Sequence, residues 1–367
     1  MRLRPYKQRE KGYVFDDPFL GYIKGYDQLE KVSWNAMELN TEADSVRYSL
    51  FPLRDIPVVD RPGYVTHERN YFNIECDDPI LKKDFEMYFT DEHSFYRDGL
   101  YGQGDALEGF LESVAHELFV TGDSFRMIEW EEVDIKGRKY QLPADFEYLR
   151  NETMKVRRKH GAIIGYRQKY SLFTYFKEKR FKGWEDKEKP RSFEFDKDEV
   201  VYCKYPFSKK SPTAQSLKYL KPIKKFWQFG IDQSKSGVEV ENHYLPLERA
   251  RYTTYAREKR KYDIARGKIR TIFNYLMESN GPRLTQYYDI YTVIRYKKFL
   301  NDFRDYLVRE FNEQVLAVVA RKNGFASVPK VIYSGFLSNT ELNAALQGYK
   351  DGTLTFDDIV QKVVKMP

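Results

Sequence analysis

The chain has 367 residues, with 62 lysines and arginines against 55 aspartates and glutamates, and a formal net charge of +7. A hydrophobic share of 41% beside 32% charged residues excludes a wholly disordered chain, and the length allows two or three domains. Cys76 and Cys203 are far apart and in no CxxC pattern, which argues against a disulfide framework or a thiolate zinc site. No run approaches the ~20 apolar residues of a membrane span, and the N-terminus lacks an apolar signal core. We therefore expect a soluble, intracellular protein.

Residues 1–62 alternate Tyr, Asp, Gly and Pro with short apolar pieces, a pattern that predicts an extended N-terminal arm. The first clear helix is expected to begin near Asp105, whose side chain can cap it, and to end at Thr121-Gly122-Asp123. Its apolar residues recur at helical spacing and predict one buried face. They are Leu107, Phe110, Leu111, Val114, Leu118 and Phe119.

A β-rich section follows. The expected strands are residues 124–133, 140–142, 154–156, 163–173, 193–195 and 200–202. Lys136-Gly137-Arg138 and His160-Gly161 are typical of turns between paired strands, while 177–191 is a charged excursion. We expect the last two strands to close the same sheet. With helices following strands along the chain, the sequence predicts an α+β fold, a mixed wing-like domain followed by long stem-like helices.

Residues 214–322 are predicted as almost unbroken helix, interrupted at Asn280-Gly281-Pro282 because proline lacks the N–H that a helix needs. The helix over 247–279 would rise ~50 Å at ~1.5 Å per residue. Its expected apolar face is Ala265, Ile269, Ile272, Phe273, Leu276 and Met277. The expected face after the break is Val293, Tyr296, Leu300, Phe303, Leu307, Phe311, Val315 and Val318.

The opposite face of the helix before the break is basic. It carries Arg249, Arg251, Arg257, Lys259, Arg260, Lys261, Arg266, Lys268 and Arg270. Only Glu248, Glu258 and Asp263 oppose these charges. Either this is a solvated helix face, as charge runs usually are, or it meets phosphate or an acidic partner.

The last region, 323–367, is predicted to be small and helical. Ser338 and Glu341 have the spacing of a capping box, Asp351-Gly352 forms a turn, and Thr355 caps a final short helix with Asp358 three residues on. The expected domains are thus residues 1–62, 63–213, 214–322 and 323–367.

No motif for catalysis stands out. The five histidines form no metal-ligand pattern, and GxSxG and the known phosphate loops are absent. Gly99, Gly102 and Gly104 have the wrong spacing for a phosphate loop, so a hinge is favoured over an anion cradle. Tyr287-Tyr288 is a weak candidate for a nucleophile.

The acidic pairs are better explained as turn and helix caps than as magnesium ligands. They are Asp16-Asp17, Asp77-Asp78 and Asp357-Asp358. We predict no catalytic residue, no cofactor and no metal site, and a protein that is not an enzyme.

Four segments, in their order along the chain, resemble a portal protein, the head-to-tail connector of tailed bacteriophages. Residues 107–130 resemble the family's helix that leads into a strand through a glycine, a small polar residue and an aromatic one. Residues 142–154 with Ile164-Gly165-Tyr166 are similar to its hairpin region. Residues 193–205, FEFDKDEVVYCKY, are similar to the strand before the central rod, and 349–355 to a turn between two short helices.

Two departures accompany the resemblance. The small clip domain that portals carry between rod helices has only short candidates here, residues 234–246 or 281–288. The chain is also short, so the crown of helices after the rod is missing or reduced to 323–367.

The resemblance implies a non-catalytic ring of identical subunits, commonly of about twelve copies, at one capsid vertex of the virion, assembled in the host cytoplasm. Double-stranded DNA would pass through its centre in packaging and ejection, and the major capsid protein, the terminase and tail adaptors would be its partners. A uniformly cationic channel would grip phosphates. We therefore expect most of the nine basic residues to face neighbouring subunits or capsid and motor partners. Reversing the charges of Arg257, Lys259 and Arg260 together should then impair assembly or packaging.

Two other hypotheses stay open. A non-catalytic nucleic-acid-binding protein of replication or recombination, monomeric or dimeric, would use the basic helix 249–270 and stack bases on its aromatic residues. A nuclease would need the acidic pairs and magnesium. Mass in solution separates the ring from the first of these, and magnesium-dependent cleavage would support the second.

Overall fold

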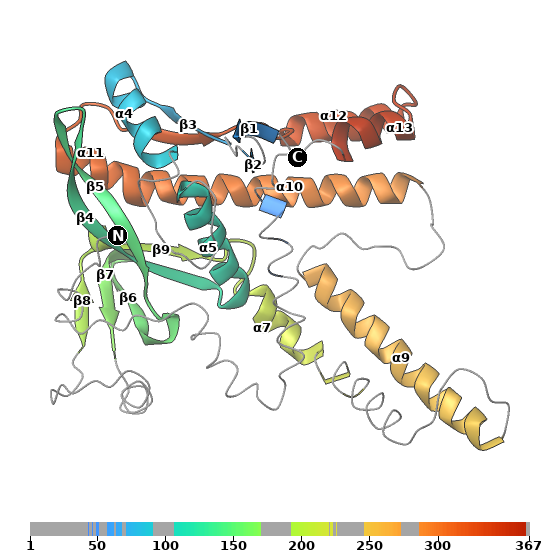
Figure 1. The fold of residues 1–367 in the computed structure, drawn as a ribbon. Helices are drawn as coiled ribbons and strands as arrows, with labels where there is room; N and C mark the ends of the chain where they lie inside the picture. The colour runs from blue at the N-terminus through green and yellow to red at the C-terminus, as the bar shows by residue number, and fades with distance from the viewer. Residues whose placement is uncertain are drawn as a thin grey trace.

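The structure is a computed structural model, and it describes residues 43, 46, 49, 50, 57–61, 64–67, 71–90, 106–169, 192–219, 221, 222, 225, 246–272 and 286–364. Within these residues the fold is α+β, as the sequence predicts, with antiparallel sheets beside long helices (Figure 1). None of the helices described is long and apolar enough to cross a lipid bilayer. The expected arm, the glycine segment at 99–104 and the charged excursion at 177–191 lie mostly or wholly outside the described residues.

The elements take these bounds. The helices are α4 Pro79–Thr90, α5 Ala106–Val120, α7 Pro212–Ser216, α9 Pro246–Ile272, α10 Gln286–Phe311, α11 Ala317–Asn323, α12 Asn339–Lys350 and α13 Phe356–Ile359. The strands are β1 Pro57–Arg61, β2 Tyr64–His67, β3 Phe72–Glu75, β4 Asp123–Ile135, β5 Arg138–Tyr148, β6 Met154–Lys159, β7 Ala162–Gln168, β8 Phe193–Phe195, β9 Val200–Lys204 and β10 Lys330–Tyr333. Short 3₁₀ turns are η2 Asn151–Thr153, η3 Lys197–Glu199 and η4 Leu217–Tyr219, and the π-helical turns are η5 Asn312–Leu316 and η6 Val360–Val364.

The strands form separate antiparallel sheets, with the orders β5-β4-β9, β6-β7-β8, β10-β3 and β1-β2. The expectation of one sheet closed by β8 and β9 was wrong. The turn η3, held by a capping box between Asp196 and Glu199, redirects the chain so that β8 pairs with β7 and β9 pairs with β4. Pairing of β10 with β3 joins segments that are remote in sequence, and no local pattern predicts it.

Both predicted hairpin turns are confirmed. Lys136 and Gly137 have φ of 53° and 82°, and His160 and Gly161 have φ of 51° and 84°. Two successive residues at positive φ match the right-handed twist of the flanking strands, which explains a glycine at each second position. The turns produce the long hairpin β4–β5 and the shorter hairpin β6–β7.

Helix α4 precedes the helix that the sequence analysis expected to be first. Asp78 caps it by accepting from the backbone N–H groups of Ile80 and Leu81, at 2.8 and 3.2 Å. Leu81, Phe85, Tyr88 and Phe89 form its buried face. These apolar residues recur at three- and four-residue steps, a spacing from which the helix could have been predicted. The charged residues between them made the pattern harder to recognise.

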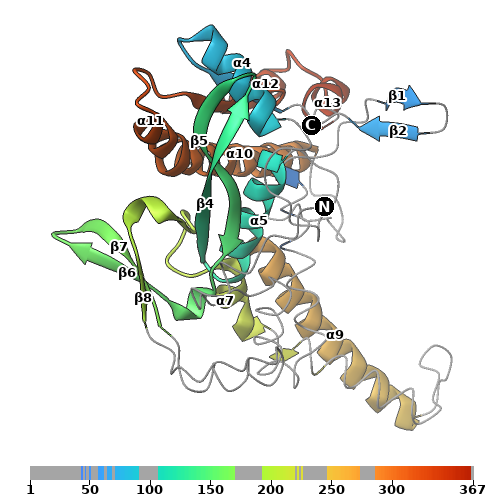
Figure 2. The same cartoon turned by 60° about the vertical axis from the view of Figure 1, so that its left-hand side comes forward.

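The main core lies where α10 passes α5, α4 and β5 (Figures 1 and 2). Phe303 packs on Phe119 with ring centroids 5.1 Å apart, and Phe311 packs on Phe110 at 5.8 Å and on Phe89 at 5.9 Å. The predicted apolar faces are confirmed here, because all six residues of α5 and all of the second long run except the half-buried Val293 are buried.

The long helical region is divided more than predicted. Helix α7 ends at Ser216 in the 3₁₀ turn η4, and α9 is described from Pro246 to Ile272. Helices α10 and α11 continue one another from 286 to 323 through the π-helical turn η5. The break at Asn280-Gly281-Pro282 lies outside the described residues, as do residues 234–245 and 281–285 of the two clip candidates. Residues 286–288 begin α10.

Three amide side chains at and beyond this π-helical turn bind three strand edges of two sheets, both edges of β5-β4-β9 and the β10 edge of β10-β3. Gln314 accepts from the N–H of Tyr202 in β9 and donates to its C=O, both at 2.8 Å. Asn312 does the same for Val331 in β10, and Asn323 for Gln141 in β5. Each amide therefore takes the place of a neighbouring strand.

Both predicted C-terminal capping boxes are present. Ser338 accepts from the N–H of Glu341 at 3.2 Å, and Thr355 accepts from that of Asp358 at 3.2 Å. Helices α12 and α13 pack on the N-terminal part of α10 in a small core of their own. The division into four domains stays a prediction, and the main core draws residues from all four of them, Val331 being its buried residue from the last.

Gly165 allows a test of the hairpin β6–β7. Its φ is 151°, and a Cβ there would lie 2.6 Å from the carbonyl oxygen of Phe195. We expect Gly165→Ala to lower the free energy of unfolding by at least about 1 kcal/mol. The matched control is Gly267→Ala in α9, where a Cβ meets nothing within 4 Å and alanine favours helix. Urea unfolding followed by circular dichroism measures both, and equal stability of the two variants would contradict the assignment of strain.

Candidate interaction surface on helix α9

Helix α9 runs away from the body that α10, α5 and the sheets form (Figures 1 and 2). Its 27 residues span ~40 Å at ~1.5 Å each. Tyr262, Ala265 and Ile269 are buried, and the helix contacts α7 and η4. Ala265 and Ile269 confirm the predicted apolar face, and the predicted Ile272 is half-buried. Phe273, Leu276 and Met277 lie outside the described residues.

The predicted basic residues are exposed wherever their side chains are described. These residues are Arg257, Lys259, Arg260, Lys261, Arg266 and Lys268. The backbone of Arg249, Arg251 and Arg270 also lies in α9, but their side chains fall outside the description. The role predicted for the nine residues remains a prediction.

Glu258, which the sequence analysis counted among the acidic residues opposing the basic face, is not exposed to solvent. Its side chain is only 3% exposed, and its Oε1 lies 2.9 Å from Nζ of Lys261, 3.5 Å from Nε of Arg257 and 3.6 Å from Nζ of Lys225. Lys225 precedes α9 in the chain, so this ion-pair cluster fastens the helix to the segment before it. The sequence could not show that a single carboxylate gathers three cations.

The hydrogen bond from Lys261 holds the pKa of Glu258 below its usual value, and the charges of Lys225, Lys261 and Arg257 add to this against the opposing effect of burial. The carboxylate therefore stays ionised at neutral pH. Three cations on one carboxylate leave the cluster positive.

Other basic residues of α9 have no acidic partner among the described residues. They are Lys259, Arg260 and Lys268, while Arg266 lies 3.4 Å from the hydroxyl of Tyr262. Arg257, Arg260, Ile264 and Lys268 follow at three- and four-residue steps and share one stripe of the helix. Ile264 is 56% exposed within it. We call Arg257, Lys259, Arg260, Ile264, Arg266 and Lys268 the α9 basic surface.

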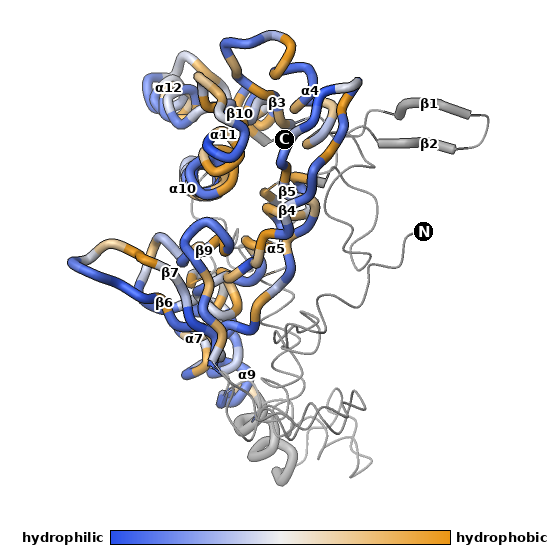
Figure 3. The backbone as a smooth tube through the Cα atoms, turned by 90° about the vertical axis from the view of Figure 1, so that its left-hand side faces the viewer, coloured by the Kyte–Doolittle hydropathy of each residue, from blue (hydrophilic) through white to orange (hydrophobic). Residues whose placement is uncertain are grey.

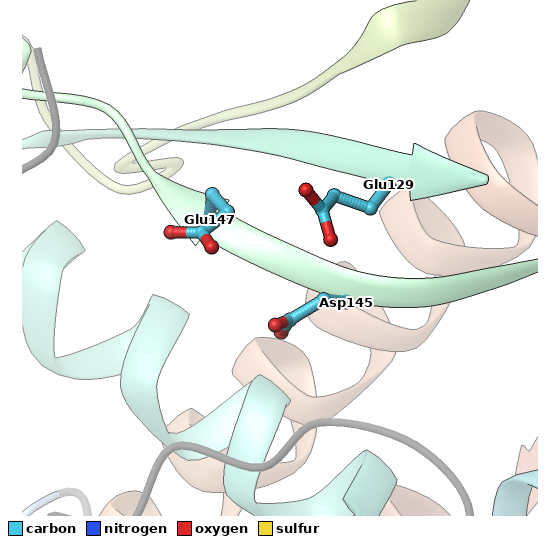
Figure 4. Close-up of side chains that lie close together, drawn as sticks. All are labelled: Glu129, Asp145 and Glu147. Atoms are coloured by element: carbon cyan, nitrogen blue, oxygen red, sulfur yellow. The ribbon is translucent and has the colours of Figure 1, made fainter. Parts of the chain in front are cut away.

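An acidic cluster that the sequence analysis missed lies on the hairpin β4–β5. Carboxylate oxygens of Glu129, Asp145 and Glu147 lie within 4.8 Å of one another (Figure 4). Strand register brings them together, since Glu129 faces Asp145 beside a β-bulge. Each of the three has an interaction partner, and no ion is assigned to the cluster.

The remaining candidates have structural roles. Asp78 and Asp358 cap helices, as predicted for their acidic pairs, while Asp16 and Asp17 lie outside the described residues. Tyr287 stacks on Tyr349 at 6.4 Å. Burial raises the pKa of the Cys203 thiol well above its usual value, which disfavours the reactive thiolate.

The buried pair Arg126 and Glu117 also holds the fold together. Arg126 on β4 donates to Glu117 on α5 and, at 3.2 Å, to the hydroxyl of Ser113. Both charged side chains are buried, so their ion pair compensates part of the hydration that each loses. The pair fixes the packing of the sheet on α5.

Comparison with known proteins gives structural matches alone. No known protein family matches the sequence, and no curated protein matches it. Among solved structures, the chain is similar to the "Neck of empty GTA particle computed with C6 symmetry" at 9% identity and a TM-score of 0.42, and to the "Neck of native GTA particle computed with C12 symmetry" at 9% and 0.41. A third is the "Virion of native gene transfer agent (GTA) particle", at 8% and 0.41. Each match covers 89% of both chains.

Glu258→Gln tests the ion-pair cluster. Because folding lowers the pKa of Glu258, its ionised form contributes stability above the unfolded pKa, near 4.5, and this contribution is lost as the pH falls through the folded pKa. We expect the variant to unfold at a lower temperature than the wild type at neutral pH, with the difference shrinking as the pH falls below the unfolded pKa. Asp263→Asn, an exposed acid on the same helix, is the control and should change little. A pH-independent difference would contradict the assignment.

Proposed function

We propose that the chain is a non-catalytic structural subunit of a ring, the portal at a capsid vertex. The observation that carries the proposal is the α9 basic surface, a set of exposed cations with one isoleucine on a helix that runs outward from the body. A long helix with one packed side leaves the other side for a partner. When one face of a subunit meets a different face of the next copy, the contact repeats, and it closes into a ring where its rotation divides a full turn.

In this proposal α9 and α10 form the stem of the ring, and the sheets β5-β4-β9 and β6-β7-β8 with α5 form the wing outside it. The reduced clip would fall at 234–246 or 281–288. The ring would have about twelve copies. Double-stranded DNA would pass through it in packaging and ejection, with the terminase, the major capsid protein and tail adaptors docked outside.

The positive charge of the α9 basic surface argues that most of this surface lies away from the channel wall. Each phosphate that a cation neutralises adds to the free energy of binding, so a continuous cationic wall would hold a duplex that must slide. We therefore propose that Lys259, Arg260 and Lys268 mainly face neighbouring subunits or acidic surfaces of capsid and motor proteins. The alternative is a monomer or dimer that binds nucleic acid through this surface.

The test is the mass of the purified protein and its image by negative-stain electron microscopy. The wild type should form a ring with a central hole. Simultaneous Lys259→Glu, Arg260→Glu and Lys268→Glu should leave smaller species, because like charges now oppose the partner surface. These three residues leave the Glu258 cluster intact.

The control variant reverses three exposed lysines elsewhere, with Lys204→Glu, Lys209→Glu and Lys210→Glu, at the same change of net charge. It should form rings as the wild type does. A wild-type monomer with salt-dependent DNA affinity would overturn the ring in favour of the alternative. If the α9 variant formed normal rings, the α9 basic surface would not be part of the contact between subunits.

A further inference from the structure

A second basic surface lies far from α9, on the hairpin β6–β7. Residues 154–169, from the first residue of β6 to one past β7, contain six lysines and arginines and no acidic residue. We call Lys155, Arg157, Arg158, Lys159, Arg167 and Lys169 the hairpin cations. Figures 2 and 3 show the hairpin reaching outward from the rest of the molecule.

Strand register divides the hairpin into an inner and an outer face. Met154 and Tyr166 are buried and pack with Phe195 and Leu149 in a small core. Lys155 pairs with Arg167 across the strands on the opposite face, because successive residues of a strand alternate between faces. The inner face fixes the hairpin, and the outer face presents Lys155, Arg157, Lys159, Arg167 and Lys169. Arg158 follows Met154 and Val156 on the inner face, near the turn.

One carboxylate neutralises part of the outer face. Glu194 on β8 lies opposite Arg167, accepting from its Nε at 2.9 Å and from Nη1 of Arg157 at 2.6 Å. Lys155, Arg158, Lys159 and Lys169 have no acidic partner in the part of the chain that the structure describes. Arg158 donates to the carbonyl oxygen of Gly161, at 3.2 Å. A net positive face remains at the end of the hairpin.

We infer that this hairpin binds the phosphate backbone of duplex DNA. A two-stranded antiparallel ribbon has the width to enter or follow a groove of the duplex. Lys155 and Lys159 stand ~13 Å apart along β6 at ~3.3 Å per residue, within the reach of successive phosphates.

An acidic protein is the less suitable partner. Protein interfaces depend on buried aromatic or large apolar anchors, and the exposed apolar side chain of this hairpin is Ile164, at 45%. The aromatic Tyr166 faces inward. Charge without an anchor matches a polyanion, whose binding is dominated by phosphate contacts.

The inference needs one subunit and does not depend on the ring. Fluorescence anisotropy with a short labelled duplex, titrated between ~50 and ~200 mM NaCl, measures affinity and its salt dependence. The variant combines Lys155→Gln, Lys159→Gln and Lys169→Gln, three exposed lysines of the outer face. It should bind at least about tenfold more weakly, and its slope of log affinity against log salt should flatten by about three, at ~0.9 per phosphate contact.

The control combines Lys204→Gln, Lys209→Gln and Lys210→Gln, which removes the same net charge from exposed positions. It should keep the wild-type slope. A gain-of-function variant, Glu194→Gln, frees Arg157 and Arg167 and should tighten binding and steepen the slope by about one. Circular dichroism confirms folding of each variant.

Wild-type affinity and slope in the triple variant would overturn the inference. So would competition by poly-L-glutamate as effective as that by unlabelled duplex, since the surface would then fit an acidic protein. The mass of every variant is measured as well, so that failure of this inference can be told apart from failure of the portal proposal. If no rings form, the salt dependence of DNA binding can still be measured for the single subunit. If rings form but DNA does not bind, only the inference about the hairpin is rejected.

Discussion

The packing of aromatic side chains along α10 is the interaction on which the rest of the structure depends. Phe303 and Phe311 contact rings from α5 and α4, and Phe311 also lies 6.4 Å from Phe146 of β5. Aromatic pairs contribute beyond the area that they bury. One helix therefore holds together elements that come from most of the chain, and Arg304 on the same helix adds hydrogen bonds of 2.6 Å to Leu50 and 3.1 Å to Ser49.

The sequence predicted what repeats locally. The apolar residues of α5 and α10 recur at helical spacing, and the glycines of two hairpin turns are required by positive φ. It could not predict the separation of β8 from β9, because a three-residue turn decides it, or the pairing of β10 with β3, because that contact is remote in sequence.

For the α9 basic surface, the sequence predicted which residues are exposed cations but not the contacts that they make. Charge periodicity in α9 gave the exposed cations. Glu258 looked like one of three opposing charges, and its burial with Lys225 depends on how the preceding segment returns to the helix. The hairpin cations were visible in the sequence, but their division between an ion pair with Glu194 and free charge follows from strand register.

The amide side chains of Asn312, Gln314 and Asn323 set a limit on how copies of this chain can join. Edges of β9, β10 and β5 have backbone groups already bound by these amides, at Tyr202, Val331 and Gln141. An incoming strand would have to displace them to extend a sheet, which is how unprotected edges aggregate. Assembly is thereby directed away from strand addition at these edges and toward contacts between side chains, where charge can determine which surfaces meet.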